Sequence, residues 1–407
     1  MPHRLASAGL DPPPAAFLTM WYLSQLGRRE HYSLAAALHR HRLLAAFCTD
    51  VWAPWAARLP EVCRPRALAQ RYRAELADAP VFAEPWSNVL RTRYDRRAVY
   101  DRWSAQGERF GRFTAEVFRR RGLAEGSTVF GYTCGNLEQL RLARQVGART
   151  IHVQVDPGPV WYATRTAAYA ANPGAGPAPA VPSAGFLDRL GEEMALADRL
   201  IVHSAHSLRS LAAAGFDTSR GRVVPPAFTP SGLGRPRSLS PCRPLRVLFV
   251  GYVNLAKGFH ILAEAVRELG PEVALTVVGG SQLPPDYLRQ IAPDVRFTGH
   301  VAQAEVARRM ADADVLVFPT LSDGFGLVQL EAMAQGLPVI ATAACGEVVR
   351  DGVDGFVVPP GESVALVERL RRLRREPDLY AAMSFAALVR ATEFGPDRHL
   401  AALLDPV

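Results

Sequence analysis

The sequence predicts an α/β protein built from two doubly wound parallel-sheet domains that face a central cleft. Short apolar runs rich in β-branched residues alternate with amphipathic helix patterns along most of the 407 residues. This alternation is typical of parallel sheets covered by helices. It stops in a segment rich in Pro, Ser, Gly and Arg at 226–244 and then restarts. A chain of this length is sufficient for two domains of ordinary size.

The first half of the chain contains five runs that we interpret as strands, at 17–23, 43–48, 128–132, 150–155 and 199–202. Helical spacing predicts helices over 31–39, 137–146 and 186–197, and the pattern of 64–121 is mostly helical. Two segments have compositions that are not typical of a buried hydrophobic core. The Pro- and Ala-rich leader 1–15 is expected to be disordered, and the Ala-, Pro- and Gly-rich insertion 171–184 is expected to be a mobile loop with little core value.

The second half shows the same alternation more clearly. Strands are predicted at 245–250, 273–278, 295–297, 314–318, 338–341 and 356–358, with a helix over 362–375 after the last of them. We therefore expect a first domain over 16–235, a linker over 236–244, a second domain over 245–390, and a tail over 391–407 that could cross back to the first domain. The ligand site of such an arrangement lies at the carboxyl ends of the strands.

Composition narrows the class of protein. The chain is 49% hydrophobic and 21% charged, which is typical of globular proteins. It has no run of 18 apolar residues, and the apolar stretch 15–23 lacks a basic flank and a cleavage site, so we expect neither a transmembrane helix nor a signal peptide. Five cysteines far apart in the sequence indicate reduced thiols without a disulfide framework or metal cluster, and hence a cytoplasmic protein.

Positive charge is concentrated in one segment, 64–121, which contains 14 arginines and only 7 acidic residues. Aromatic residues such as Trp86, Tyr94 and Trp103 are interleaved with this charge. A solvated helical face above an aromatic core explains the pattern, and so does peripheral contact with anionic lipid at the inner face of a membrane. No nucleic-acid-binding motif accompanies the charge, so nucleic acid is not expected as a partner.

Lys257 is the only lysine among 47 basic residues. It follows the apolar strand that ends near Gly251 and stands before Gly258, at the start of a helical pattern. Free N–H groups at a helix start and a compact cation both favour an anion, so the loop predicts a phosphate site. Its spacing matches neither the Walker A loop nor the dinucleotide-binding glycine pattern.

A second glycine turn lies at 319–338. A buried strand gives way to Asp323, Gly324, Phe325, Gly326 and Leu327, and a helical pattern follows. Backbone N–H groups of this turn can hold phosphate or sugar oxygens. Glu331 lies eight positions after Asp323, so the two carboxylates could hold two hydroxyl-bearing parts of one ligand. Ordinary capping of a helix start by acidic residues explains the same pattern.

These motifs resemble the retaining glycosyltransferases of family 4, the glycosyl transferases group 1, which have the GT-B fold of two Rossmann-like domains. The resemblance rests on Gly251-x5-Lys257-Gly258, Phe297-Thr-Gly299-His300-Val301, Asp323-x7-Glu331, the run 331–341 and Asp351-Gly352-x-x-Gly355-Phe356. The segments 25–32, 154–159 and 192–204 are similar to first-domain landmarks of a subset of that family. The likeness therefore covers nearly the whole chain beyond the leader and outside 171–184.

The resemblance implies a donor-binding set and a catalytic set. The donor-binding residues are Gly27, Gly251, Lys257, His300, Val301, Asp323, Gly324, Phe325, Gly326, Leu327 and Glu331, and the catalytic residues are Lys257, Asp323 and Asp156. Lys257 would meet the donor diphosphate, and the amides of 324–327 would hold the transferred sugar and its phosphate. Glu331 would bind the ribose, and the turn at 300–301 would lie against the base. Gly27 would let the first loop approach the diphosphate.

The chain departs from the family pattern at three places. Asp323 stands where the family usually has Glu, Tyr252 where many members have Arg, and Asp156 where the first domain often supplies a His. We expect Asp156 to orient a sugar, although capping of the Pro-Gly turn explains it equally well. His152, four residues earlier, is the nearest histidine.

The function implied is retaining transfer of a sugar from a UDP- or GDP-sugar to a glycan, lipid-linked or small-molecule acceptor. Neither a metal nor another cofactor is expected, because no His/carboxylate cluster with metal-ligand spacing is evident. A nucleotide-sugar epimerase and a non-catalytic GT-B partner protein remain as alternatives.

Overall fold

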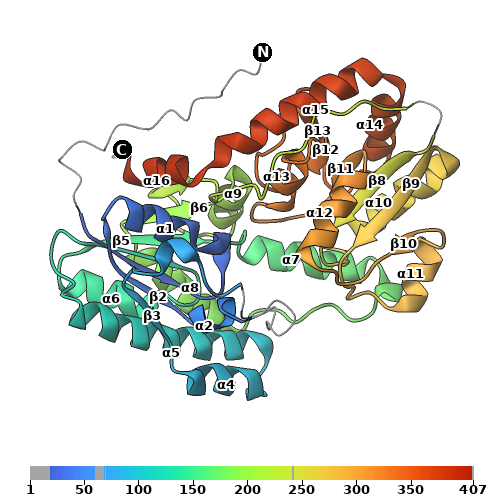
Figure 1. The fold of residues 1–407 in the computed structure, drawn as a ribbon. Coiled ribbons are helices and arrows are strands. Elements are labelled where there is room, and N and C mark those ends of the chain that lie inside the picture. The colour runs from blue at the N-terminus through green and yellow to red at the C-terminus, as the bar shows by residue number, and fades with distance from the viewer. Residues whose placement is uncertain (1–18, 60–67, 69, 241–242, 406–407) are drawn as a thin grey trace, which may run out of the picture.

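The computed structural model describes residues 19–59, 68, 70–240 and 243–405. Two parallel sheets dominate it (Figure 1), one of seven strands and one of six. The predicted fold class of two doubly wound parallel-sheet domains is thereby confirmed. The predicted leader 1–15, the first residues of the strand expected at 17–23, and part of the basic segment 64–121 lie outside the described residues.

The first sheet has the strand order β3-β2-β1-β4-β5-β6-β7. Its strands are β1 Trp21–Gln25, β2 Leu44–Thr49, β3 Val81–Ala83, β4 Thr128–Tyr132, β5 Arg149–Gln154, β6 Arg199–Val202 and β7 Gly221–Val223. The helices of this domain are α1 Ser33–Arg40, α2 Pro54–Ala57, α4 Trp86–Tyr94, α5 Val99–Arg120, α6 Leu137–Gln145, α7 Pro159–Ala170, α8 Ala184–Leu196 and α9 Ala205–Ala213. All neighbouring strand pairs are parallel.

Both faces of the first sheet are buried, and the alternation within β1 shows how. Trp21 and Leu23 pack in one apolar cluster with residues of α1, whereas Tyr22 packs in another with Phe110 and Phe118 of α5. Successive side chains of a strand point to opposite faces, so helices are required on both. This explains why β1 reads as a continuous apolar run in the sequence.

The second sheet has the order β10-β9-β8-β11-β12-β13. Its strands are β8 Leu245–Val250, β9 Val273–Val278, β10 Arg296–Phe297, β11 Val315–Phe318, β12 Val339–Thr342 and β13 Gly355–Val358. Its helices are α10 Phe259–Leu269, α11 Pro285–Ile291, α12 Gln303–Asp312, α13 Val328–Met333, α14 Ser363–Arg375 and α15 Pro377–Ala391. Val247 and Phe249 pack toward α10 and α14, and Leu248 packs on the face of α13.

Strand boundaries in the second half agree with the sequence expectations to within a residue or two, and those of β8 and β9 coincide with them. In the first half, β1 begins and ends later than expected. Ser24 and Gln25 are buried in the strand, and Gln25 Nε2 donates to the Arg29 carbonyl at 2.6 Å. The strand therefore continues two residues beyond the expected end, through two polar side chains that the fold buries. The segment 64–121 contains the strand β3 besides its helices.

Three passes of chain connect the domains. The segment 224–240 forms the direct link, and α16 (Pro396–Leu404) packs on α1 of the first domain, where Leu400 and Leu403 join the apolar cluster. The third pass runs through α7 and the 3-10 turn Pro173–Ala175. Tyr169 and Ala175 lie in the core cluster of the second domain, with Ala175 only 1% exposed.

The contact at Ala175 corrects one expectation. The composition of 171–184 suggested little core value, but the segment lies against α11: the Tyr287 hydroxyl donates to Asn172 Oδ1 at 3.1 Å. A Cβ on Gly174 would lie 3.0 Å from the Tyr287 ring. Small residues are needed here because the chain passes close to a neighbouring aromatic ring, which low-complexity composition alone does not reveal.

Candidate active site

A cavity of about 600 Å³ lies between the two domains. The first domain lines it with residues after β1, among them Arg28 and Glu30, and the second with one face of α12 and of α13, including Leu327 and Glu331. The link at 227–232 closes one side. Ligand sites in proteins of this architecture lie at such interdomain clefts.

Lys257 is held in a tight loop after β8. Its N–H donates to Asn254 Oδ1 at 2.9 Å, and its Nζ forms an ion pair with Asp323 and lies 5.4 Å from the centroid of the Phe318 ring. Gly258, with φ +70, packs so closely on the next loop that a Cβ would lie 1.8 Å from the Pro319 carbonyl oxygen. The loops of Lys257 and Asp323 are therefore in direct contact.

The loop between β11 and α13 touches the first domain. A Cβ on Gly324 would lie 2.0 Å from the carbonyl oxygen of Val155 and 3.4 Å from the Cα of Asp156. Among the described residues, the amides of Gly324, Gly326 and Leu327 donate to no other group. The Phe325 amide differs from the other three, since it donates to Asp323 Oδ1 at 3.2 Å.

Glu331 lies apart from Asp323, on the cavity side of α13. Burial raises the pKa of its carboxyl, and the positive charge of Arg28 across the cavity opposes that rise. His300 lies beside the loop that carries Lys257, with its ring centroid 5.8 Å from that of Tyr252. Val301 packs against the cluster that also contains Leu330.

Gly27 begins the loop after β1. It has φ +80, and its amide donates to Asp50 Oδ1 at 3.0 Å, an oxygen that Arg71 also contacts at 2.8 Å. No atom lies within 4 Å of the position of a Cβ on Gly27, so the left-handed backbone and not crowding favours glycine there.

The next residues form an unusual turn. Glu30, His31 and Tyr32 have φ of 50°, 48° and 61°, so three successive non-glycine residues are left-handed. Such a conformation costs roughly 1–2 kcal/mol per residue and persists only where the surroundings hold it. Arg73 Nη1 donates to the His31 carbonyl at 2.9 Å, and Ser33 Oγ donates to the Glu30 carbonyl at 2.5 Å.

The carboxyl group of Glu30 is buried at the carboxyl ends of the first sheet. The Tyr132 hydroxyl donates to it at 3.3 Å, and His203 Nε2 lies 3.9 Å away. Burial raises the pKa of Glu30 to about 7, against the opposing charge of Arg29. Burial also lowers the pKa of His203 to about 4. His203 is therefore neutral near pH 7, and its approach to Glu30 is not an ion pair.

Asp156 follows β5. Its Oδ1 accepts from Gln154 Nε2 at 2.9 Å and from the Gly158 amide at 2.8 Å, which is the capping arrangement expected of an Asp before a Pro-Gly turn. Burial raises the pKa of Asp156, and Arg29 opposes the rise. His152 is fully buried, and burial lowers its pKa to about 4. Asp156 adjoins the Gly324 loop, because a Cβ on Gly324 would lie 3.4 Å from its Cα.

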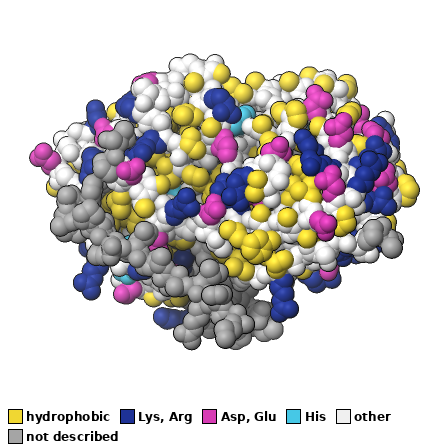
Figure 2. Space-filling view, turned by 90° about the horizontal axis from the view of Figure 1, so that it is seen from above, with side chains coloured by type: hydrophobic (Ala, Val, Ile, Leu, Met, Phe, Trp, Pro, Cys, Tyr) yellow, Lys and Arg dark blue, Asp and Glu magenta, His cyan; other side chains and the backbone are white. Residues whose placement is uncertain are grey.

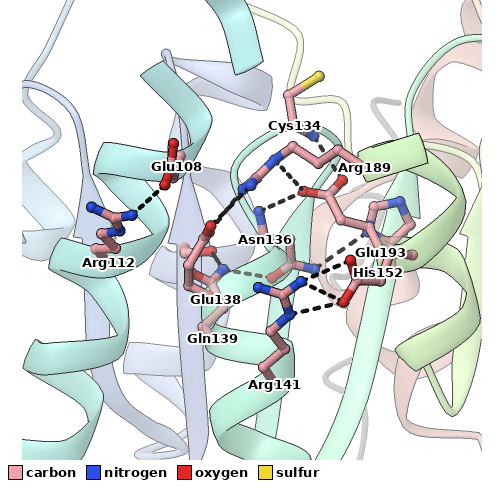
Figure 3. A network of polar contacts seen from close by, with 12 residues as sticks. Glu108, Arg112, Cys134, Asn136, Glu138, Gln139, Arg141, His152, Arg189 and Glu193 are labelled. Atoms are coloured by element: carbon pink, nitrogen blue, oxygen red, sulfur yellow. Dashed lines mark hydrogen bonds and ion pairs between the residues drawn. The ribbon is translucent and has the colours of Figure 1, made fainter. Parts of the chain in front are cut away.

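A buried network supports the turn after β4 (Figure 3). The Glu193 carboxylate accepts from the amides of Cys134 and Asn136 at 2.9 and 3.1 Å, and Arg189 pairs with Glu138 beside it. Burial raises the pKa of Glu193 to about 7. None of these side chains is among those that line the cavity, and Glu193 holds the backbone of the turn that follows β4.

Sequence reasoning did not assign a role to Arg28, Arg29 or Glu30. Gly27, Glu30 and His31 were part of a motif, but their backbone conformation cannot be read from residue types. The only signal was the position of two arginines directly after a glycine turn. No three His, Cys, Asp or Glu side chains in the described ranges gather as a metal site requires.

Comparison with known proteins places this geometry in context. Residues 244–376 match the family model described as glycosyl transferases group 1. That segment carries Lys257, Asp323 and Glu331.

Several similar curated proteins share one name. D-inositol 3-phosphate glycosyltransferase of Xylanimonas cellulosilytica is 33% identical over 244 residues, which cover 53% of this chain and 58% of that protein. The protein of the same name from Streptomyces griseus is 36% identical over 201 residues, covering 44% of this chain and 43% of that protein. The chain thus spans about half the length of these relatives.

Solved structures match nearly the whole chain. Sucrose-phosphate synthase from Thermosynechococcus elongatus superposes with a TM-score of 0.69 at 19% identity and covers 94% of this chain and 97% of its own. Anabaena Alr3699/HepE, solved in complex with UDP, gives a TM-score of 0.60 at 16% identity, with 95% of this chain and 98% of that chain covered. These likenesses show the GT-B fold.

Proposed function

We propose that the protein is a retaining glycosyltransferase of family 4 that moves a sugar from a nucleotide-diphosphate sugar to an acceptor. One observation carries the proposal. Lys257, the free amides of Gly324, Gly326 and Leu327, and Asp156 come together where the two domains touch. The family-model match over 244–376 supports it.

This arrangement suits departure of a diphosphate. Cleavage of the anomeric carbon–oxygen bond leaves negative charge on the diphosphate, and fixed N–H donors and a cation lower the barrier when they face that charge. Lys257 and the three free amides are such groups. They supply the role for which other transferases need a metal, so we propose that no metal or other cofactor is required.

Retention follows if the acceptor hydroxyl attacks from the face that the diphosphate leaves. The acceptor oxygen forms the new bond to the anomeric carbon as the old carbon–oxygen bond breaks, and the departing diphosphate takes the acceptor proton. No side chain has to act as a nucleophile. Asp323 and Asp156, on either side of the Gly324 contact, would then orient sugar hydroxyls.

The donor proposed is a UDP- or GDP-sugar. Glu331 offers a carboxylate on the cavity face, where it can accept hydrogen bonds from the two hydroxyls of a ribose. In this proposal His300 and Val301 would lie against the base, and Gly27 and Gly251 would let their loops approach the diphosphate. The fold neighbour Alr3699/HepE was solved with UDP and with UDP-glucose, which supports uracil as the first base to test.

The acceptor proposed is a glycan, a lipid-linked compound or a small molecule, presented at the inner face of a membrane. No helix in the described part of the chain meets the length and apolarity that a membrane span requires. The helix α4, at the lower edge of Figure 1, has no buried residue. Its Trp86, Leu90 and Tyr94 are 49%, 52% and 74% exposed and recur every four residues, so they form one face.

Arginines 91, 93 and 96 accompany that face and are also exposed. Aromatic and apolar side chains flanked by arginine match the interface of an anionic bilayer. In contrast, basic and acidic side chains are interspersed among the described residues on the face shown in Figure 2. We therefore propose that the protein is cytoplasmic and that α4 makes its peripheral contact with lipid.

A thermal-shift panel of UDP, GDP and ADP, with and without attached sugars, tests the donor site on wild type and Glu331→Ala. The proposal expects one nucleotide to stabilise wild type but not the variant. Formation of a glycoside from that donor then separates the alternatives. Release of a free epimerised sugar without acceptor would indicate an epimerase, and binding without hydrolysis or transfer would indicate a non-catalytic partner.

A further inference from the structure

One face of β5 carries a row of buried polar side chains. Thr150, His152 and Gln154 point to the same face, because side chains alternate along a strand, and each of them is 0% exposed. On the opposite face, Ile151 and Val153 lie in the apolar core cluster of the first domain. Burying a polar group without hydrogen bonds costs free energy, so each side chain in this row requires partners.

Gln154, at the end of β5, has its amide held at both ends. Its Oε1 lies 2.7 Å from the hydroxyl of Thr133, which has one proton to donate to this oxygen or to the Val153 carbonyl at 2.9 Å. Its Nε2 donates to Asp156 Oδ1 at 2.9 Å and to the Asp156 carbonyl at 3.1 Å. The orientation of the amide is therefore fixed, since both groups beside Nε2 are acceptors.

The two oxygens of the Asp156 carboxylate have different surroundings. Oδ1 accepts from Gln154 Nε2 and from the Gly158 amide. Oδ2 accepts no hydrogen bond from the described residues, and it is not one of the atoms that the fold both buries and leaves unpartnered, so it keeps accessible surface. Because Asp156 adjoins the Gly324 loop, one oxygen is held by the protein and the other is available to a ligand there.

The hold on Oδ1 fixes the direction of Oδ2. A carboxylate held by the Gly158 amide alone could still turn about its Cβ–Cγ bond, and the second donor from Gln154 removes that freedom. Orientation of this kind matters for catalysis, because a displacement of about 1 Å can cost roughly 100-fold in rate. An apolar side chain at position 154 would fill the same space without needing partners, so the core alone does not require an amide there.

We propose that Gln154 is a positioning residue for sugar transfer, which rests on the proposed transferase function. It holds Asp156 Oδ1 so that Oδ2 meets a hydroxyl of the sugar, and Thr133 orients the Gln154 amide in turn. The cap on the Pro-Gly turn and the orientation of a sugar are then two roles of one carboxylate, with one oxygen for each.

The same hydrogen bond affects the protonation of Asp156. Burial raises the pKa of this carboxyl, and the N–H donors of Gly158 and Gln154 oppose the rise because they favour the ionised form. Removing the Gln154 donor therefore raises the pKa of Asp156 further, and a reaction that needs the ionised carboxylate fails at a higher pH. The other charged or titratable side chains that interact with Asp156 are Arg29, Asp323, Cys134, Tyr100 and Tyr162.

The pH dependence of kcat/KM tests the proposal, with hydrolysis of UDP-glucose by the full chain as the probe reaction. The variants are Gln154→Met, which keeps the length of the side chain but has no N–H, Thr133→Val, and the two combined. Thr150→Val is the matched control, because its hydroxyl is equally buried on the same face of β5 but contacts Leu196 and Asp198 instead. Melting temperatures are recorded for each.

In Gln154→Met, kcat at pH 7 should fall about tenfold, and the acidic limb of the profile should move to higher pH by about one pH unit. Thr133→Val should shift the limb in the same direction by less. The double variant should be no worse than Gln154→Met, because both residues act through one chain of hydrogen bonds. Thr150→Val should lower the melting temperature and leave the limb in place. A limb at the wild-type pH in Gln154→Met would overturn the proposal, even with a lowered melting temperature.

The NMR signal of the Asp156 carboxyl carbon gives a second measurement that does not depend on turnover. Asp156→Asn assigns the signal by its absence, and its titration midpoint is compared between wild type and Gln154→Met. The proposal expects a higher midpoint in the variant, and an unchanged one would overturn it whether or not UDP-glucose is hydrolysed. A raised midpoint in a protein whose wild type does not hydrolyse UDP-glucose would confirm the hold on Asp156 and count against the proposed transfer from that donor.

Discussion

Lys257 and Asp323, which lie 66 residues apart in the sequence, form an ion pair at the meeting point of two loops of the second domain. Their side chains are 31% and 15% exposed, so the pair is partly accessible to solvent. The lysine Nζ that the proposed diphosphate needs is therefore held by a carboxylate before the donor arrives. Donor binding exchanges one anion for another.

The first prediction concerns the cation. Lys257→Ala should lower kcat by about 100-fold or more, because charge on the leaving group loses its principal partner. Lys257→Arg should recover only part of it, since the guanidinium has a different shape and reach. Initial rates with a saturating donor measure this, with far-ultraviolet circular dichroism as the folding control. Wild-type rates in Lys257→Ala would contradict the phosphate assignment.

The second prediction separates the two partners. Asp323→Asn removes the anion that competes for Lys257 and keeps the side-chain shape, so UDP should bind several-fold more tightly than to wild type. Transfer should nevertheless fall, because Asp323 is proposed to orient the sugar. Calorimetry with UDP and rate measurements with the full donor test the two halves separately. Weaker UDP binding would show that the carboxylate supports the site and does not compete within it.

The third prediction concerns the contact between the domains. Gly324→Ala places a Cβ 2.0 Å from the Val155 carbonyl oxygen, closer than atoms can approach, so the loop and the turn at Asp156 must separate. We expect transfer to fall at least tenfold while both domains remain folded. Gly185→Ala is the matched control, because no atom lies within 4 Å of the new Cβ. Activity equal to that of the control would show that the contact is dispensable.

The fourth prediction is a pH dependence. The pKa of Glu30 is raised to about 7 in the folded protein, so the folded state binds its proton more tightly than the unfolded state does. The stability that this group contributes is present below its unfolded pKa, near 4.3, and is lost as pH rises through about 7. The Glu30→Gln variant has no carboxyl group at this position, so its stability does not fall in this way as pH rises. Its melting temperature relative to wild type should rise between pH 5 and pH 8 by a few degrees.

A second buried carboxyl group titrates in the same pH range. The pKa of Glu193, in the buried network of Figure 3, is also raised to about 7. Both wild type and Glu30→Gln retain Glu193, so its titration cancels in the difference between them. A constant difference across the pH range would contradict the raised pKa of Glu30.

The fifth prediction tests lipid contact. Wild type should float with vesicles that contain anionic lipid, and Trp86→Ser with Tyr94→Ser should reduce the bound fraction several-fold. These side chains are 49% and 74% exposed, so the double variant should fold normally. Phe385→Ser, 60% exposed on α15, is a matched control. Equal binding to neutral and anionic vesicles would argue against the role of the arginines.

The sequence predicted the loops of the second domain well. Strands such as β8 are buried on both faces and therefore appear as uninterrupted apolar runs, and glycine marks each turn after them. The positions of Lys257 and Asp323 followed from those local patterns. Their pairing with one another did not, because it depends on the close approach of Gly258 to Pro319.

The first domain was harder to predict for a physical reason. The surroundings of Glu30 depend on a left-handed turn and on burial beside Tyr132, which is 102 residues away in the sequence. Residue types alone report neither. The two interpretations of Asp156 were also left open by the sequence, and the structure contains the cap on one of its oxygens.

The passage of α7 and Ala175 into the core of the second domain limits how the protein can be divided. A fragment that begins at β8 would lack Tyr169 and Ala175 and would expose the apolar surface that they cover. A fragment that ends before α16 would likewise uncover α1, where Leu400 and Leu403 pack. Each half therefore depends on the other to cover part of its apolar core, and a fragment cut at either of these points would lose that cover.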